Sequence, residues 1–224
     1  MNGIFSSSLG KKLIMSITGL FLMMFLLVHL TVNLMLLVGD EAFNLAANFM
    51  ATNPVIEIIE PILAIGFVIH IIYASIITLL NRQKRPIGYI NSSSNGVTTW
   101  ASKNMYILGG TVLIFLVIHL INFYWKINFG ELAKISYNND ASSMDNTYAL
   151  VSGLFTSYWW YDLIYIIGAI LLGLHISHGF WAAFQTLGWN NKLWIKRLEV
   201  IAYIFAVVVA TGFSIIPLYF LVLK

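Results

Sequence analysis

Five long apolar segments, separated by shorter polar connections, make up most of this chain. They cover about residues 13–38, 55–80, 104–125, 159–187 and 200–222. A helix of about 20 apolar residues is long enough to cross the roughly 30 Å hydrocarbon core of a bilayer. The apolar residues are continuous within each segment, whereas the strands of a transmembrane β-barrel alternate apolar and polar positions. The pattern therefore predicts an all-α membrane protein with five transmembrane helices.

The composition agrees with this prediction. Of the 224 residues, 59% are hydrophobic and only 9% are charged, which is outside the range of soluble domains. No connection is long enough to fold alone, so we expect residues 1–224 to form a single transmembrane domain. The chain has no cysteine. It therefore cannot form a disulfide, hold an iron–sulfur cluster of its own or attach a haem covalently through Cys-x-x-Cys-His.

The connections carry turn and cap signals. Residues 39–54 read as a polar connection, and either Pro54 or Pro61 can begin the second helix, because proline is tolerated in a first turn. Residues 126–157 form the longest connection, in which we expect a short interfacial helix. Gly188 follows the fourth segment, where a glycine cap is expected.

Basic residues are concentrated on one side of the predicted membrane. They fall at the N-terminus and in the second and fourth connections, and an excess of this kind marks the cytoplasmic side. The N-terminus is therefore predicted to be cytoplasmic and the C-terminus outside. We interpret these bases as topology signals and not as a nucleic-acid surface. They are Lys11, Lys12, Arg82, Lys84, Arg85, Lys103, Lys192, Lys196 and Arg197.

Four histidines lie within the first four apolar segments, one in each: His29, His70, His119 and His175. An ionisable side chain inside a membrane span costs free energy and usually marks function. At a rise of 1.5 Å per residue, His29 and His119 lie roughly 25 Å from the cytoplasmic edge, and His70 and His175 about 18 Å. Depth alone therefore pairs His29 with His119 and His70 with His175.

Two facing imidazoles are the axial ligands that a six-coordinate haem iron needs. Two pairs thus predict two non-covalent b-type haems in a core of four helices, with the fifth helix beside it. A single histidine could equally form a helix–helix hydrogen bond or part of a proton path, but four in matched pairs favour haem. His178 competes with His175 as a ligand, since the two lie about one turn apart. Its depth is less well matched, so we favour His175.

A weak internal repeat supports the equal depth of the outer histidines. Gly19 precedes His29 by ten residues and Gly109 precedes His119 by ten. The sequences around the two histidines are also alike, Phe-Leu-Leu-Val-His-Leu against Phe-Leu-Val-Ile-His-Leu. Both helices are expected to run outward from the cytoplasm.

Several motifs occur in a specific order along nearly the whole chain. They are Ser16-Ile-Thr-Gly19-Leu, His29-Leu-Thr-Val-Asn33, Gly39-Asp-Glu-Ala-Phe-Asn44, His70, His119 and His175-Ile-Ser-His178-Gly179-Phe-Trp181. In this order the chain resembles the membrane cytochrome b subunit of bacterial succinate dehydrogenases and quinol:fumarate reductases, of the single-chain, five-helix, two-haem type.

The resemblance implies an electron-transfer anchor in the bacterial cytoplasmic membrane. Such a subunit binds two haems b and a quinone, which we expect to be menaquinone, and docks a flavoprotein and an iron–sulfur subunit on its cytoplasmic face. It implies that His70 and His175 hold the inner haem, and His29 and His119 the outer one. Ser16 falls where the family places a polar residue near an inner-haem propionate. Dicarboxylate chemistry belongs to another subunit, so no catalytic residue is expected here.

One position departs from the pattern. Some quinol:fumarate reductases of this type carry a proton-conducting glutamate two residues before the fourth-helix histidine, and this chain has Gly173. We interpret the glycine as allowing a haem or a helix to approach closely. Glu57 and Glu60, near the outer start of the second helix, are candidates for proton exchange with a quinone. Their alternative role, as surface acids at a helix N-terminus, is the favoured one.

Two other functions remain open from the sequence. A free-standing transmembrane haem b carrier without a succinate-linked partner would need the same four histidines. A proton-coupled transporter could use them as relays, but it would favour carboxylates within the spans and broken helices near the midplane. Glu57, Glu60 and Glu199 lie towards the ends of the spans, which disfavours the transporter.

Overall fold

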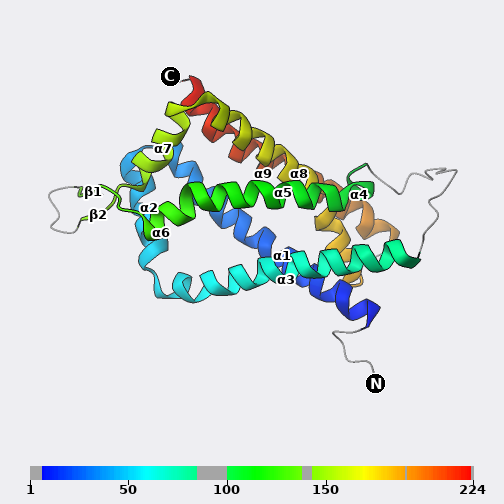
Figure 1. Ribbon diagram of the computed structural model, residues 1–224. Coiled ribbons are helices and arrows are strands. Elements are labelled where there is room, and N and C mark those ends of the chain that lie inside the picture. Colours follow the sequence, from blue (N-terminus) through cyan, green and yellow to red (C-terminus); the bar gives the residue numbers. More distant parts are fainter. Residues whose placement is uncertain (1–6, 85–99, 138–142, 190, 223–224) are drawn as a thin grey trace.

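The computed structural model describes residues 7–84, 100–137, 143–189 and 191–222. Among them are five helical segments long and apolar enough to cross a membrane, and the chain is an all-α, multi-pass membrane protein with five candidate spans. The first residues of α1 and the last residues of α9 lie at opposite ends of the bundle (Figure 1). This is the arrangement expected of an odd number of spans.

The elements follow one another in a simple order. The helices are α1 (Ser8–Leu34), α2 (Asp40–Thr52), α3 (Pro54–Lys84), α4 (Trp100–Lys103), α5 (Met105–His119), α6 (Trp125–Phe129), α7 (Thr147–Ser157), α8 (Trp159–Thr186) and α9 (Lys192–Val222). A 3₁₀ turn, Met35–Leu37, extends α1, and a π-helical turn, Leu120–Tyr124, joins α5 to α6. The strands β1 (Lys134–Ile135) and β2 (Met144–Asp145) form a short antiparallel hairpin.

Side-chain caps make three of the spanning helices begin earlier than the apolar segments do. Ser7 accepts a hydrogen bond from the Gly10 amide at 3.0 Å, so α1 begins at Ser8. Asn53 accepts from the Val55 amide at 2.9 Å and α3 begins at Pro54, which decides between the two candidate prolines. Asn191 accepts from the Trp194 amide at 2.9 Å ahead of α9. Caps of this kind satisfy backbone amides that a helix start leaves unpaired. They therefore allow a helix to begin in the polar residues that precede the apolar segment.

The predicted glycine cap after the fourth span is confirmed. Gly188 has a φ of +100°, a conformation that side chains other than glycine rarely adopt, and its amide donates to the Gln185 carbonyl at 3.2 Å.

The two polar connections on the C-terminal side contain more structure than the sequence indicated. Residues 39–54, which the sequence indicated as a polar connection, contain the helix α2. Residues 126–157 contain the expected short helix, α7, together with the hairpin. Figure 1 shows these elements gathered at one end of the bundle. The signal for α2 was present as Asp40 and Glu41 in its first turn, where acidic residues stabilise a helix N-terminus.

Asn44 connects the elements at this end of the bundle. Its side chain is fully buried, donates to the Tyr137 hydroxyl at 2.8 Å and to Asn146 Oδ1 at 3.2 Å, and accepts from the Tyr148 amide at 2.8 Å. The Tyr137 hydroxyl in turn donates to Asp40 at 3.3 Å. Burial raises the pKa of the Tyr137 phenol, so the phenol stays protonated and remains a donor. One amide thus joins α2, the hairpin end and α7.

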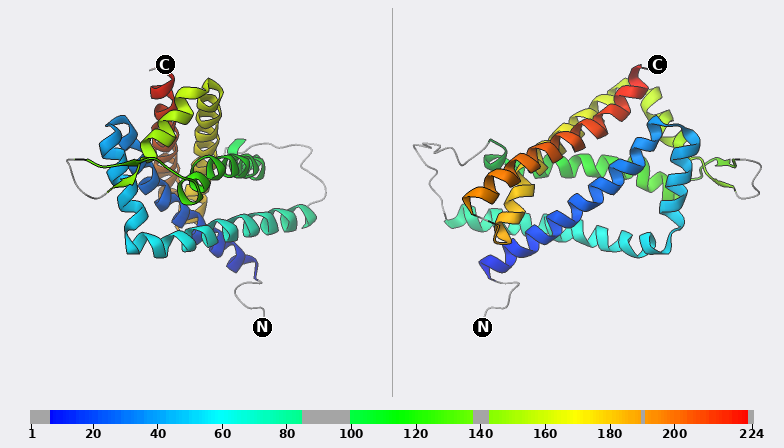
Figure 2. Two further views of the ribbon diagram at one scale, coloured as in Figure 1. Left: turned by 60° about the vertical axis from the view of Figure 1, so that its left-hand side comes forward. Right: turned by 180° about the vertical axis from the view of Figure 1, so that it is seen from behind.

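The five spans are packed unevenly. Helices α8 and α9 lie side by side along their length, as both views of Figure 2 show, and α1 packs against α3, α8 and α9. Helix α5 packs mainly on α8, and α3 packs mainly on α1. Of the five candidate spans, the one formed by α3 has the smallest buried share.

Small residues allow α8 and α9 to approach closely. A Cβ placed on Gly173 would lie 2.8 Å from the Cβ of Ala210 and 3.2 Å from the carbonyl oxygen of Ala206. Ala206 and Ala202 are buried one and two turns before Ala210 on α9. Small residues four apart are a common device for close helix packing in membranes. Of the two interpretations of Gly173, close approach of a helix is the one these contacts support.

We predict that Gly173→Ala destabilises the protein, because the added methyl group would clash with the α9 backbone. Overpacking of this kind costs about 1–3 kcal/mol. Gly110→Ala is the matched control, since a Cβ there meets nothing within 4 Å and removing a helical glycine gains roughly 0.5–1 kcal/mol. Thermal unfolding in detergent should show a lower Tm for the first variant and an equal or higher Tm for the second. Equal behaviour of the two would contradict the packing argument.

Candidate functional site

The four span histidines come together as two pairs. The imidazole centroids of His29 on α1 and His119 on α5 are 5.7 Å apart, with the ring planes at 86°. Those of His70 on α3 and His175 on α8 are 6.5 Å apart, with the planes at 75°. The partners are the ones that depth along the helices predicted. Each pair joins a helix to a neighbour that is distant in sequence.

Glycines line the pair formed by His70 and His175. A Cβ on Gly19 would lie 3.4 Å from His70 Cε1, and one on Gly109 would lie 3.3 Å from His175 Cε1. Each imidazole therefore lies close to the backbone of the neighbouring helix, where an added Cβ would be in van der Waals contact with the ring or slightly closer. These are the two glycines of the internal repeat.

Aromatic rings surround the pair formed by His29 and His119. Phe25 stacks on His29 at 5.2 Å and Phe213 lies 5.6 Å from it. His119 contacts Phe115, Phe123 and Tyr165 at centroid distances of 6.2, 5.3 and 6.1 Å. The Tyr165 hydroxyl accepts a hydrogen bond of 3.1 Å from the buried Asn122 amide. The Asn33 amide lies 3.4 Å from His29 Nδ1.

A backbone irregularity directly follows His119. The five residues Leu120–Tyr124 form a π-helical turn between α5 and α6. Such turns are rare, often occur at functional sites, and rotate the residues on either side relative to an unbroken α-helix. Here the turn begins directly after His119 and ends at Tyr124, whose hydroxyl donates to Glu60 at 2.7 Å.

The donor set of each pair fits haem better than a bare metal ion. Among the described residues no group of three or more His, Cys, Asp and Glu side chains comes together, whereas protein zinc sites use three or four such ligands. A haem needs only two protein ligands, because the porphyrin supplies the other four. With metal–imidazole bonds of about 2 Å, two imidazoles on opposite sides of one metal place their centroids about 6 Å apart. The observed 5.7 and 6.5 Å bracket that value.

His178 faces a different neighbour. Its ring lies edge-on to Trp181, with the centroids 4.9 Å apart, and no other described histidine ring is recorded against it. Its Nδ1 is buried and has no hydrogen-bond partner within the described part of the chain. The geometry therefore places His175, and not His178, opposite His70.

The other predicted site residues lie at the two ends of the bundle. Ser16 is buried on α1, one turn before Gly19 and the His70 contact. Glu57 lies exposed in the first turn of α3, and the exposed Glu60 accepts the Tyr124 hydrogen bond. The structure thus places Ser16 about one turn from the glycine that contacts His70, and leaves Glu57 and Glu60 exposed near the start of α3.

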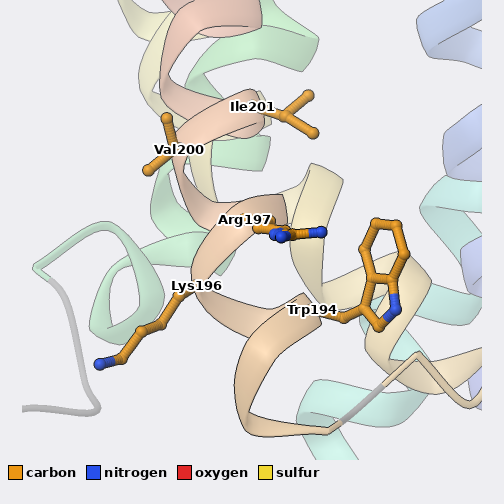
Figure 3. Close-up of a pocket in the computed structure, with 5 residues that line it drawn as sticks. All are labelled: Trp194, Lys196, Arg197, Val200 and Ile201. Carbon is orange, nitrogen blue, oxygen red and sulfur yellow. The ribbon is translucent and has the colours of Figure 1, made fainter.

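Two surface hollows lie away from the histidines. One, of about 440 Å³, is lined by residues of α9: Trp194, Lys196, Arg197, Val200 and Ile201. In Figure 3 Lys196 and Trp194 point in opposite directions, and the Arg197 guanidinium lies 5.6 Å from the Trp194 ring. The other, of about 460 Å³, lies at the turn between α1 and α2. Neither contains a predicted site residue.

Sequence reasoning missed the neutral partners of the histidines. Thr18 lies 3.3 Å from His70 Nδ1, and Tyr165 and Phe213 lie against the outer pair. A threonine or an aromatic residue within an apolar segment carries no pattern that distinguishes it from the rest. The repeat of glycine ten residues before histidine was read only as a sign of equal depth for His29 and His119; the contacts of Gly19 with His70 and of Gly109 with His175 were not predicted.

Comparison of the chain with family models, with curated proteins and with solved structures finds no match. The site is therefore interpreted from its own chemistry: two pairs of histidine rings in an apolar bundle, with no third His, Cys, Asp or Glu side chain gathered at either pair among the described residues.

Proposed function

We propose that this chain is the membrane anchor and electron-transfer subunit of a succinate:quinone oxidoreductase, either a succinate dehydrogenase or a fumarate reductase. The observation that carries the proposal is the presence of two facing histidine pairs, His29 with His119 and His70 with His175. The resemblance of the motifs around them to the two-haem cytochrome b subunits supplies the identity of the complex.

Two haems b account for features that simple polar contacts do not. Imidazoles that only stabilised helix packing could pair with any polar neighbour, whereas a haem would be held by two imidazoles. Among the described residues each pair consists of two histidines, and no third His, Cys, Asp or Glu side chain gathers with them. Bound haem would supply reversible one-electron chemistry, and the protein contributes ligands, burial and orientation.

The residues around the two pairs have distinct tasks in this proposal. His70 and His175 hold the inner haem between α3 and α8, with Ser16 available to a propionate on the cytoplasmic side. His29 and His119 hold the outer haem between α1 and α5, within the aromatic wall of Phe25, Phe213 and Tyr165. Along α1, the contact with His70 at Gly19 and the outer ligand His29 are about 15 Å apart by helix rise.

The cytoplasmic end is the proposed docking side for an iron–sulfur subunit, which is itself attached to a flavoprotein. The chain has no cysteine, so the cluster that exchanges electrons with the inner haem must come from a partner. The bases that set the topology border this surface. Lys84 and Arg85 belong to this group by sequence, but the side chain of the first and all of the second lie outside the described residues.

A membrane quinone, for which we expect menaquinone, is the proposed second redox partner. Glu57 and Glu60 are the candidate groups for proton exchange with it, since both are exposed at the outer end of α3. Glu60 accepts a hydrogen bond from the Tyr124 hydroxyl, and Tyr124 ends the π-helical turn, five residues past the proposed ligand His119.

We predict that alanine substitution removes the haems separately. His70→Ala or His175→Ala should lower the haem content from about two to about one per chain and remove one spectral component. His29→Ala or His119→Ala should remove the other, because each iron loses an axial ligand. Pyridine haemochrome assay and redox-resolved absorption spectra measure both. The pairing is wrong if His29→Ala and His70→Ala eliminate the same component while His119→Ala spares it.

His178→Ala should leave both haems bound, since His178 lies against Trp181 and not opposite another span histidine. His175→Ala, three residues away on the same helix, is the control and should lose the inner component. Absorption and electron paramagnetic resonance spectra of the two purified variants make the comparison. If the inner component survives in His175→Ala and is lost in His178→Ala, the ligand assignment is reversed.

Purification from native membranes in mild detergent should bring a flavoprotein and an iron–sulfur protein along with this chain. In a protease footprint, the bound partner subunits should protect residues 82–103 and 188–197, on the basic side, and leave 126–157 accessible. The membranes should show quinone-linked succinate or fumarate activity that disappears when the chain is deleted. A chain that purifies alone with both haems, from membranes lacking that activity, would instead be the free-standing haem b carrier.

A further inference from the structure

Thr18 of α1 is in direct contact with one imidazole of the inner pair. Its hydroxyl oxygen lies 3.3 Å from His70 Nδ1. The same hydroxyl donates to the Ile14 carbonyl at 2.9 Å, with the Met15 carbonyl at 3.1 Å as a second acceptor. A threonine hydroxyl has one proton and two lone pairs. Because the backbone carbonyls take the proton, the hydroxyl meets His70 as an acceptor, and His70 Nδ1 must carry a hydrogen.

The next residue fixes which edge of the ring faces α1. A Cβ on Gly19 would lie 3.4 Å from His70 Cε1 and 3.7 Å from Nδ1, and no other atom of that ring comes within 4 Å. The Nδ1–Cε1 edge therefore lies nearest to α1, and Nε2 is farther from this position than either of those atoms. His175 has the same orientation towards α5, with its Cε1 and Nδ1 at 3.3 and 3.7 Å from the corresponding position on Gly109.

We infer that Thr18 is a positioning residue for the inner haem, because it accepts a hydrogen bond from His70 Nδ1 and so fixes the tautomer in which Nε2 bears the lone pair that binds iron. This inference rests on the proposed function. It adds Thr18, which is not itself a proposed haem ligand, to the residues that act at the inner haem. Histidine ligands of metals generally donate their second N–H to such a partner, which sets the ring orientation and raises the basicity of the ligating nitrogen.

The inner pair is asymmetric in this respect. The His70 ring has the Thr18 hydroxyl and the Met15 backbone as hydrogen-bond partners, whereas His175 Nδ1 is buried without one among the described residues. Removing the Thr18 hydroxyl therefore removes the side-chain hydrogen bond recorded for this pair and leaves the Met15 backbone contact. His29 lies eleven residues beyond Thr18 on α1, within its aromatic wall, and the pair it forms should be unaffected.

Thr18→Val tests the inference, because valine keeps the shape of threonine and replaces the hydroxyl by a methyl group. A less basic His70 stabilises ferric iron less, so the midpoint potential of the inner haem should become more positive while that of the outer haem stays unchanged. Thr18→Ser retains the acceptor and should restore the wild-type potential. Thr31→Val is the matched control, since the exposed Thr31 on the same helix donates to the Leu27 carbonyl at 2.8 Å.

The measurement is a spectroelectrochemical titration of the complex purified with its partner subunits, together with the electron paramagnetic resonance signals of both ferric haems. A positive shift and an altered signal of the inner haem alone, reversed in Thr18→Ser and absent in Thr31→Val, support the inference. A wild-type complex with two haems and an unchanged Thr18→Val variant overturns it and leaves the proposed function intact. A wild-type chain without haem overturns both. A shift that Thr18→Ser does not reverse overturns the hydrogen-bond argument, since the effect would then be one of packing.

Discussion

Four imidazoles inside an apolar bundle impose the constraint on which the rest of this structure depends. A polar group in hydrocarbon is costly unless it has a partner, and the fold brings the four span histidines together in two pairs. Around His70 and His175 the neighbours are the glycines of α1 and α5 and the Thr18 hydroxyl. Around His29 and His119 they are aromatic rings. The same pairing of histidines thus occurs twice, with different surroundings.

The internal repeat gains a physical meaning from these contacts. Ten residues advance a helix by about 15 Å and turn it by about 80° short of three full turns. On α1 this spacing puts Gly19 against His70 of α3 and His29 against His119 of α5. On α5 it puts Gly109 against His175 of α8 and His119 against His29. Each helix therefore supplies a backbone surface to one pair and a ring to the other, which is why the two segments share a pattern.

Much of the fold could be predicted from the sequence because the membrane makes length and apolarity decisive. The five spans and the pairing of the histidines by depth follow from a regular helix rise alone. The helix ends depended on single caps such as Ser7 and Asn191, and α2 was missed because its polar residues resemble a loop. Thr18 and Tyr165 could not be found, since their role depends on which helix lies opposite and not on any local pattern.

The uneven packing of the spans explains why a single hydroxyl matters at the inner pair. Helix α3 packs mainly on α1 and is open to lipid over much of its length. Near its start, Glu60 accepts a hydrogen bond from Tyr124 of the π-helical turn, and near its end Arg82 lies over the Tyr106 ring of α5. His175 stands on α8, which is held along its length by α9. His70 stands on a helix without that support, so its ring orientation depends on specific contacts with α1, where Gly19 supplies the surface and Thr18 the hydrogen bond.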